Sequence, residues 1–342
     1  MRWGVLLAGG SGTRFWPLST PDNPKQLLPL AGSRSTAEEA MHRLDGLIPR
    51  ERVLLVTGQT LAPRLRERMG LAEKNVLVEP RAASTGPALI WASHEASRRD
   101  PDAEVLSMHA DWVVGDADAF RRTAELALAA ARTHDRLVTV GMLPSRPETG
   151  FGYIVPGAPL GDTARNVARF SEKPDAATAL DLLAAGALWN SGLFAWTAAR
   201  LFAEVRQHTP EIAPHLGALE AGDVARFFRD VTPISIDVGV LERSRNVAVV
   251  RGAFAWDDVG TWEALTRVRA KDPDGNVVVG PAHLHRAKDC VVWADGDPIV
   301  LSGVQDLIVV HANGRILIMT RDQSTELKQL LDTLPAEIRD IP

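Results

Sequence analysis

Three glycines and two cationic side chains follow the first apolar segment of this chain. The glycines are Gly9, Gly10 and Gly12, and the cations are Arg14 and Lys25. Because glycine has no Cβ, the backbone can bend sharply there and approach an anion closely. Successive backbone N–H groups in such a bend form a concave anion site, to which the two cations add positive charge. The loop therefore predicts a binding site for a polyphosphate.

Two common phosphate-binding loops do not fit this segment. A Walker A loop needs Lys and then Ser or Thr after its last glycine, whereas Gly12 is followed by Thr13 and Arg14. A dinucleotide-binding loop needs a third small residue, and Phe15–Pro17 stands in its place. The loop belongs to another class.

Carboxylates that could bind a metal ion lie in two distant segments. Asp111 follows the apolar run Val105–Met108 after two residues, and a lone carboxylate beside a buried strand is costly unless it is hydrogen-bonded or metal-bound. The second segment, WDDVGTW at Trp256–Trp262, contains Asp257 and Asp258. These three aspartates are candidates for metal ligands or for structural hydrogen-bond acceptors.

The elements that position these residues alternate between strand and helix in the first half of the chain. Strand patterns occur at Trp3–Ala8, Val53–Thr57, Val76–Glu79, Val105–Met108 and Leu137–Gly141. Helical patterns lie between them, at Thr36–Leu44, Leu61–Met69, Pro87–Ser97 and Ala119–Arg132. This order predicts parallel strands with helices on both faces, and ligands bind beyond the carboxyl ends of such strands. The glycine loop and Asp111 both fall there.

The second half is less regular. Helical patterns occur at Ala176–Ala185 and Ala198–Gln207, a further helix is expected at Trp262–Ala270, and short β-type runs fill residues 276–319. A helix at Ser324–Leu334 would close this β-rich part. The expected domains are therefore 1–271, which holds the α/β sheet, and 272–342, a small β-rich C-terminal domain with a terminal helix.

Composition narrows the class of protein. The chain has 342 residues, 45% of them hydrophobic, with a formal net charge of -5 and no basic block. This argues against nucleic-acid or membrane-surface binding. Its one cysteine, Cys290, excludes an internal disulfide framework. No apolar run approaches the roughly 18 residues of a membrane span, and the N-terminal run is too short for a signal peptide, so a cytoplasmic protein is expected.

The motifs resemble those of the sugar nucleotidyltransferases. Arg14 after the glycines and Lys25 after Pro24 match that family's G-x-G-x-R and P-K elements. Pro24-Lys25-Gln26, the WNSG segment Trp189–Gly192 and WDDVGTW are similar to the mannose-1-phosphate guanylyltransferases, in their short monofunctional form. The resemblance covers nearly the whole chain. It implies a Rossmann-like, GT-A-like mixed and mostly parallel sheet with flanking helices, plus a small β-helix-like C-terminal domain.

The resemblance also implies a nucleotide site. The β- and γ-phosphates would bind backbone N–H groups of Gly9–Thr13 together with Arg14, and Lys25 would lie beside the α-phosphate. Glu79, Pro80 and Thr85 match the segment that lies along the base; Ser84 or Thr85 could cap a helix there, and the two interpretations can hold together. The implied nucleotide-binding residues are Leu7, Ala8, Gly9, Gly10, Ser11, Gly12, Thr13, Glu79, Pro80, Thr85 and Ala110, with Arg14 and Lys25 as catalytic residues.

The family resemblance makes Asp111 and Asp258 the ligands of Mg²⁺, with phosphate oxygens and waters completing an octahedron. His109 and Trp112 differ from the family's residues on either side of the matching aspartate. Asp257 is a rival ligand, or else the cap of the following helix.

Three segments resemble parts of a sugar-phosphate site. Glu172 and Lys173 match the F-x-E-K-P motif, Asn190 and Gly192 match W-N-S-G, and Gly152 matches G-Y-G-Y-I. The alternatives are an exposed Glu–Lys pair before a helix, and a β-bulge at the glycine. Asp237 and Glu242 are further candidates, either for binding sugar hydroxyls or for a structural role.

The reaction implied by the resemblance converts GTP and α-D-mannose 1-phosphate into GDP-mannose and pyrophosphate, with Mg²⁺ as cofactor and a homodimer as the expected assembly. The alternatives are another pair, such as glucose 1-phosphate with UTP or dTTP, or a non-catalytic nucleotide-sugar sensor. A sensor would be expected to lose Arg14, Lys25 or a metal aspartate, and this chain keeps them all.

Overall fold

The structure is a computed structural model that describes residues 1–10 and 13–340, and at Thr13 the backbone alone. The chain divides into two compact units. The first, here the sheet unit, comprises Met1–Gly9, Ala40–Ala110 and Asp116–Trp256. The second, here the tail unit, comprises Gly10–Glu39, Asp111–Gly115 and Asp257–Pro342. The boundary predicted between residues 271 and 272 falls inside the tail unit and stays a prediction.

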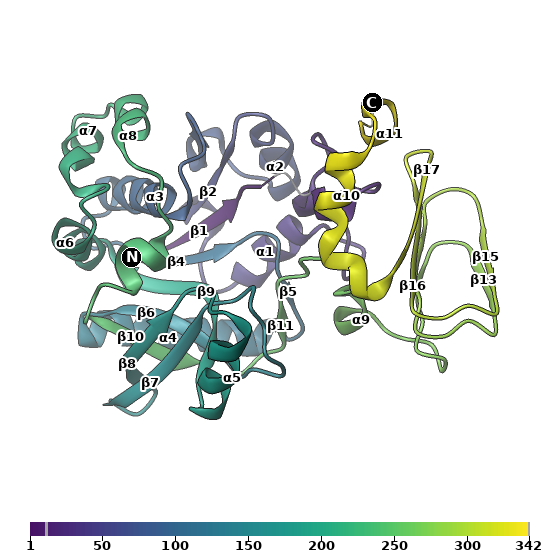
Figure 1. The fold of residues 1–342 in the computed structure, drawn as a ribbon. Helices are drawn as coiled ribbons and strands as arrows, with labels where there is room; N and C mark the ends of the chain where they lie inside the picture. The colour runs from purple at the N-terminus through teal and green to yellow at the C-terminus, as the bar shows by residue number, and fades with distance from the viewer. Residues whose placement is uncertain (11–12, 341–342) are drawn as a thin grey trace. The chain divides into compact units, whose positions relative to one another are not determined.

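The sheet unit contains a mixed sheet, with the strand order β3-β2-β1-β4-β9-β6-β10-β8-β7 among the described residues (Figure 1). The parallel part is β1 (Arg2–Ala8), β2 (Val53–Gly58), β3 (Val76–Glu79) and β4 (Glu104–His109). β9 (Leu188–Thr197) runs antiparallel to both β4 and β6 (Leu137–Met142). The remaining strands are β10 (Val247–Arg251), which is parallel to β6, and the antiparallel pair β7 (Tyr153–Leu160) and β8 (Ala164–Ser171). The mostly parallel order expected for the first half is confirmed.

Helices connect these strands, and local signals fix their ends. The carboxylate of Asp116 accepts from the backbone N of Ala119 at 2.9 Å, and the helix α4 begins after it. Gly70 adopts the left-handed conformation, with a φ of 61°, where α2 ends. The helices are α1 (Thr36–Leu44), α2 (Ala62–Met69), α3 (Thr85–Arg99), α4 (Ala117–His134), α5 (Ala176–Ala184), α6 (Ala198–His208), α7 (Leu216–Glu220) and α8 (Val224–Asp230), with a π-helical turn at Asp237–Leu241.

Strand β1 shows that helices cover both faces of the sheet. Val5 and Leu7 belong to a buried cluster that includes the inner side chains of α3 and α6. On the other face, a Cβ at Gly4 would lie 3.1 Å from Cδ1 of Leu44 in α1. Because successive side chains of a strand point to opposite faces, α3 and α1 lie on opposite sides of β1. The carboxyl end of β1, where the glycine loop begins, therefore opens between two helical layers.

The tail unit carries two parallel ladders that alternate along the chain, as in a β-helix. One ladder pairs β12 (Val277–Val279), β14 (Val291–Ala294) and β16 (Leu307–Ala312), and the other pairs β13 (Ala282–His285) with β15 (Ile299–Ser302). β17 (Arg315–Thr320) adds to β16 in the antiparallel sense. The remaining elements are β5 (Val113–Val114), which pairs with β11 (Trp256–Asp257), and the helices α9 (Leu265–Val268), α10 (Leu327–Thr333) and α11 (Ala336–Arg339).

The core of the tail unit explains why the Lys25 loop belongs to it. Phe15 and Trp16 lie in one buried cluster with Trp262 and Trp293. Phe15 meets Trp262 edge-on, with ring centroids 5.1 Å apart, and Trp262 Nε1 donates to the carbonyl of Trp16 at 3.0 Å. The residues between the glycines and Lys25 are thus part of a packed aromatic core, which holds the loop in place.

Two helix predictions in this region are wrong in extent. The expected helix Trp262–Ala270 is reduced to α9, because residues 261–264 bend to bury Trp262. The closing helix begins with a 3₁₀ segment, Arg321–Glu326, and only then continues as α10. No helix in the described ranges combines the length and the apolar character that a membrane span requires.

Candidate active site

Lys25 is the best-held cation of the glycine loop. Its side chain is only 10% exposed, and its Nζ donates to Asp111 Oδ2 at 3.0 Å and to the carbonyl of Asp258. The backbone around it is fixed as well, since the Lys25 carbonyl accepts from the Leu28 N–H at 3.0 Å. The structure therefore brings together three residues that lie far apart in sequence, all within the tail unit.

Asp111 follows the carboxyl end of β4. Just before it, the N–H of Ala110 donates to the Leu7 carbonyl at 2.9 Å, which ties the exit of β4 to the end of β1. Ala8, the last residue of β1, has its carbonyl held by Thr57 Oγ1 at 2.7 Å. Leu7, Ala8 and Ala110 are all buried. The strand ends that precede the candidate site are thus fixed by backbone and hydroxyl hydrogen bonds.

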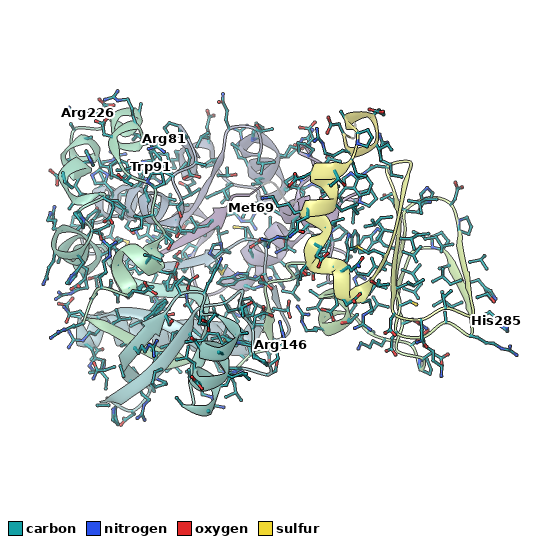
Figure 2. All side chains as sticks on the ribbon, in the orientation of Figure 1. Met69, Arg81, Trp91, Arg146, Arg226 and His285 are labelled. Atoms are coloured by element: carbon teal, nitrogen blue, oxygen red, sulfur yellow. The ribbon has the colours of Figure 1, made fainter. Side chains whose placement is uncertain are left out.

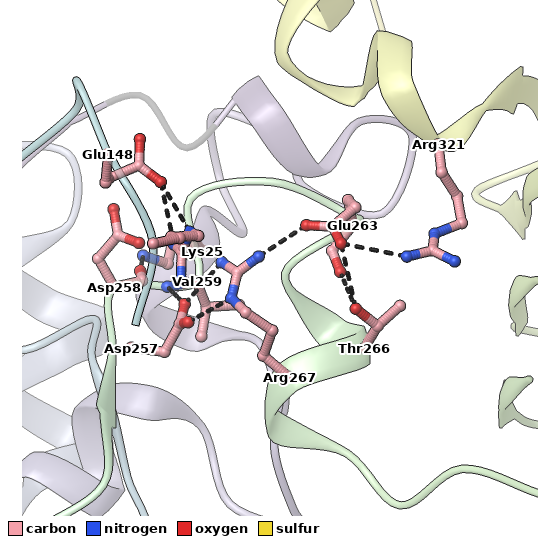
Figure 3. A network of polar contacts seen from close by, with 10 residues as sticks. Lys25, Glu148, Asp257, Asp258, Val259, Glu263, Thr266, Arg267 and Arg321 are labelled. Atoms are coloured by element: carbon pink, nitrogen blue, oxygen red, sulfur yellow. Dashed lines mark hydrogen bonds and ion pairs between the residues drawn. The ribbon is translucent and has the colours of Figure 1, made fainter. Parts of the chain in front are cut away.

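The two adjacent aspartates of WDDVGTW have different surroundings (Figure 3). Both carboxylate oxygens of Asp257 are used, by Arg267 at 2.6 and 3.1 Å and by the Val259 N–H at 2.8 Å. Burial raises the pKa of Asp258, against the opposing charge of Lys25, and the neighbouring carboxylates of Asp257 and Asp111 raise it further. Asp257 is thus held by structural hydrogen bonds, whereas Asp258 is a half-buried carboxylate whose raised pKa shows that its surroundings disfavour its negative charge.

The carboxylates of Asp111 and Asp258 fit a hard divalent cation. They supply oxygen donors, and like-charge repulsion between them is relieved by a cation. Among the described residues no cluster of three or more His, Cys, Asp or Glu side chains is arranged to hold a metal ion. Two carboxylates would leave the other coordination positions of such a cation to waters and further oxygen ligands.

The glycine loop is described in part. Gly10 has a φ of 92°, a left-handed conformation that glycine adopts without strain. Arg14 is exposed, and a Cβ at Gly260 would lie 3.7 Å from its Nη1 and 3.1 Å from Asp258 Oδ2. The guanidinium of Arg14 and the carboxylate of Asp258 therefore flank the same glycine. Ser11, Gly12 and the side chain of Thr13 lie outside the described residues.

Asn190 is the centre of a polar cluster in the sheet unit. Its Oδ1 accepts from Thr139 Oγ1 at 2.9 Å and from the Gly192 N–H at 3.3 Å. Its Nδ2 donates to Asp237 Oδ1 at 2.8 Å. Its backbone N–H donates to the Gly152 carbonyl at 2.7 Å. Burial raises the pKa of Asp237 and the Asn190 hydrogen bond opposes this rise.

Glu172 belongs to the same cluster. A Cβ at Gly152 would collide with Glu172 Oε2 and lie 3.3 Å from the Cβ of Asn190. Oε2 of Glu172 is buried and has no hydrogen-bond partner within the described ranges. Burial, followed by the charge of Asp237, raises the pKa of Glu172 to about 7. Such a carboxylate is suited to accept a hydrogen bond from a hydroxyl group.

Lys173 and the segment predicted to lie along the base lie outside the Asn190 cluster. Lys173 is exposed, with a left-handed φ of 52°. Glu79 ends β3 half-buried, and burial raises its pKa, while Pro80 is exposed. Thr85 begins α3, and its Oγ1 accepts from the Ile236 N–H at 3.0 Å. Ser84 precedes the helix without a side-chain capping hydrogen bond, so the alternative of a capping serine is wrong.

Comparison with known proteins decides the family. Residues 3–275 match the family model described as nucleotidyl transferase, and residues 286–334 match one described as MannoseP isomerase/GMP-like beta-helix domain. A mannose-1-phosphate guanylyltransferase from Klebsiella pneumoniae is 34% identical over 346 residues, which span 96% of this chain and 73% of that protein. The chain belongs to the mannose-1-phosphate guanylyltransferase family.

Two further proteins are similar to this chain over nearly its whole length. The alginate biosynthesis protein AlgA from Pseudomonas aeruginosa is 34% identical, over 98% of this chain and 72% of its own length. A solved structure from Thermus thermophilus, described as a mannose-1-phosphate geranyltransferase, superposes with a TM-score of 0.89 at 35% identity. The match covers 97% of this chain and 98% of that one. The predicted fold, a nucleotidyltransferase sheet followed by a β-helix-like part, is confirmed.

Several residues in and around the Asn190 cluster were not predicted from the sequence. Thr139 holds Asn190, and a polar residue inside the apolar run Leu137–Gly141 is the signal that would have found it. The guanidinium of Arg146 lies over the ring of Trp189 at 5.1 Å and pairs with Glu148 at 3.0 Å. Figure 2 labels Arg146 in the sheet unit. Glu242, a candidate with two possible roles, accepts from the Glu172 N–H at 2.7 Å, which is a structural contact.

Proposed function

We propose that this chain transfers the guanylyl group of GTP to α-D-mannose 1-phosphate, giving GDP-mannose and pyrophosphate. The observation that carries the proposal is the cluster of buried Lys25 with half-buried Asp111 and Asp258, in which Lys25 and Asp111 form an ion pair at 3.0 Å. A cation and two carboxylates held in one place suit a reaction in which phosphate charge has to be bound and redistributed. Family membership supplies the substrate class.

The chemistry requires positioning rather than proton transfer. An oxygen of the sugar phosphate attacks the α-phosphorus of GTP in line, the new P–O bond forms, and the bond to pyrophosphate breaks. The attacking oxygen is already anionic, so no general base is needed. Lys25 would stabilise the negative charge that develops as pyrophosphate leaves, and Arg14 with the N–H groups of Gly9–Thr13 would bind the β- and γ-phosphates.

Asp111 and Asp258 would hold Mg²⁺ through their carboxylate oxygens. When bound, this cation supplies charge that offsets the repulsion between the phosphates of the two substrates. Lys25 donates to Asp111 and to the Asp258 carbonyl, and so fixes the orientation of both residues.

The Asn190 cluster would bind the sugar. Glu172 would accept hydrogen bonds from sugar hydroxyls through its buried Oε2, and Asn190 is held in one orientation by Thr139 and Asp237. Gly152 leaves room for this carboxylate because it has no Cβ. Lys173, which is exposed, would bind the sugar phosphate.

Glu79, Pro80 and Thr85 would contact the base. The donor-rich N1/N2 edge of guanine matches a carboxylate acceptor, and Glu79 is the half-buried carboxylate at the end of β3. The other nucleotide-binding residues are the glycine loop with Leu7, Ala8 and Ala110 at the strand ends. The homodimer and the cytoplasmic location expected from the sequence stay predictions.

A pyrophosphate-release assay across five nucleoside triphosphates and several sugar 1-phosphates tests the proposal. Turnover should be fastest with GTP and mannose 1-phosphate. A clear preference for UTP or dTTP with glucose 1-phosphate would reject the base and sugar assignment. No release with any pair would reject catalysis and favour the sensor.

A further inference from the structure

A series of ion pairs begins at the WDDVGTW segment, here the acidic loop, which carries Asp258 (Figure 3). Asp257 binds Arg267 through two hydrogen bonds, from Nε at 2.6 Å and from Nη2 at 3.1 Å. The same guanidinium donates from Nη1 to Glu263 Oε2 at 2.6 Å. The other oxygen of Glu263 accepts from Arg321 Nη2 at 3.2 Å. All four residues belong to the tail unit.

At the Asp257 end, this series of ion pairs fixes the backbone of the acidic loop. Asp257 Oδ1 accepts the Val259 N–H at 2.8 Å, and Val259 has a φ of 44°. A β-branched residue in the left-handed region is strained, so it persists only where its surroundings hold it. Between them lies Asp258, whose carbonyl accepts from Lys25. The carboxylate of Asp257 thus holds the bend that sets the direction of both the Asp258 carbonyl and its side chain.

The far end is anchored in the β-rich part. Arg321 follows β17, and its Nη1 donates to the Asp289 carbonyl at 3.0 Å. Its backbone N–H donates to the Asp306 carbonyl at 2.9 Å. Asp289 and Asp306 both have left-handed φ values, of 52° and 56°, and stand at corners between β-strands. Arg321 is therefore held by the turns at Asp289 and Asp306 in the β-rich part while it binds Glu263.

These ion pairs are partly shielded from water. The side chains are 10% exposed at Asp257, 29% at Arg267, 31% at Glu263 and 22% at Arg321. Bidentate arginine–carboxylate pairs with this degree of burial fix geometry better than exposed pairs, which contribute little. Both oxygens of Asp257 are bound by Arg267 and the Val259 N–H, and the proposed reaction gives Asp257 no contact with substrate.

We propose that Asp257, Arg267, Glu263 and Arg321 form a positioning relay, through which the β-rich part of the tail unit sets the geometry of Asp258 and Lys25. Arg267 is the central positioning residue because it touches both carboxylates. This inference rests on the proposed function, which gives Lys25 and Asp258 their roles. It assigns to the β-rich part a contribution to turnover that requires no contact with substrate.

The first test is kinetic and uses Arg267→Met in the full chain. The variant should lower kcat about 10- to 100-fold, the range for a lost supporting contact, while the KM for mannose 1-phosphate stays within about 2-fold. Arg267→Lys keeps the charge but not the two-bond geometry, and should recover only part of the loss. Arg321→Met, one step further away, should lower kcat by about 2- to 10-fold. Arg226→Met, which removes an exposed pair with Asp230 in the sheet unit, is the matched control and should leave kcat unchanged.

The second test does not depend on activity. Hydrogen exchange of the peptide that covers Asp257–Thr261 should be faster in Arg267→Met, because the Val259 N–H loses its fixed acceptor. The double variant Asp257→Asn/Arg267→Met should lose no more kcat than the stronger single variant, since both act through one contact. Additive losses, unchanged exchange, or faster exchange with wild-type kcat would each overturn the relay. If the wild-type chain releases no pyrophosphate, the proposed function fails, and the exchange experiment alone decides whether Arg267 holds the loop.

Discussion

Lys25→Met is the sharpest test of the proposed active site. Coulomb's law gives about 5.5 kcal/mol for two unit charges as close as Lys25 Nζ and Asp111 Oδ2, which lie 3.0 Å apart, at an effective dielectric constant of about 20. Only the part of such an interaction that grows in the transition state accelerates the reaction. We therefore expect a loss of about 3 kcal/mol, or roughly 100- to 1,000-fold in kcat.

The fold should survive this substitution. Asp111 would lose its cation, but its side chain is 27% exposed and can be hydrated. The loop is anchored by the aromatic cluster around Trp262 and by the hydrogen bond between the Leu28 N–H and the carbonyl at position 25. Circular dichroism melting should therefore show a cooperative transition.

The assay is pyrophosphate release at saturating GTP and mannose 1-phosphate, with KM measured for each substrate. Because the charge of Lys25 is needed mainly as pyrophosphate leaves, both KM values should change by less than about 3-fold. Lys328→Met, which removes an exposed lysine of α10, is the matched control. A kcat of Lys25→Met within about 3-fold of the wild type would refute the reasoning. It would mean that Lys25 does not supply the electrostatic stabilisation of the transition state, which is expected to be the largest contribution.

Three further outcomes are expected. Asp111→Asn and Asp258→Asn should each abolish magnesium-dependent turnover, measured by titration with Mg²⁺, and full activity in either variant would remove that residue from the metal site. Gly152→Ala should raise the KM for mannose 1-phosphate about 10-fold or more, because the new Cβ collides with Glu172 Oε2; an unchanged KM would separate that carboxylate from the sugar. The raised pKa of Glu172, about 7 against 4.5, means that the folded state binds its proton more tightly. Protonated Glu172 thus adds up to about 3 kcal/mol to the stability of the folded state. This contribution is complete below pH 4.5 and is lost as the pH rises through 7. Glu172→Gln should therefore show a flatter dependence of melting temperature on pH, and parallel curves would contradict the assigned pKa.

The parallel half of the sheet could be predicted because its signals are local. Strand β1 is a continuous apolar run that ends in glycines, and the helix Thr36–Leu44 has the predicted bounds. Parallel strands buried on both faces need such runs, and each is followed by an amphipathic helix. The prediction of a polyphosphate-binding loop rests on local signals as well, since glycines and cations cluster within a few residues.

Strand β9 could not be predicted, although its motif was recognised. Asn190, Ser191 and Gly192 are residue types that strands disfavour. They are tolerated in the middle of the sheet because Ser191 Oγ donates to the Val140 carbonyl at 2.7 Å, while Asn190 is bound by Thr139 and Asp237. These partners lie some fifty residues away in sequence. A strand that is stabilised by distant polar partners leaves no local pattern to read.

The choice between Asp257 and Asp258 shows the same limit at the scale of one residue. Composition treats the two aspartates alike, and the family resemblance favours Asp258, which directly precedes Val259-Gly260, with Asp257 as a rival. What separates them is Arg267, which occupies Asp257 from ten residues away, and Lys25, which meets the carbonyl of Asp258 from the other end of the chain. The carboxylate of Asp257 is thereby engaged by Arg267 and Val259, and the proposed function assigns the carboxylate of Asp258 to the metal ion. The helix cap considered for Asp257 is wrong because α9 begins only at Leu265, and the residue that its carboxylate does cap is Val259. Under the proposed function, the adjacent acids therefore divide two tasks between them: Asp257 positions the loop and Asp258 binds the metal ion.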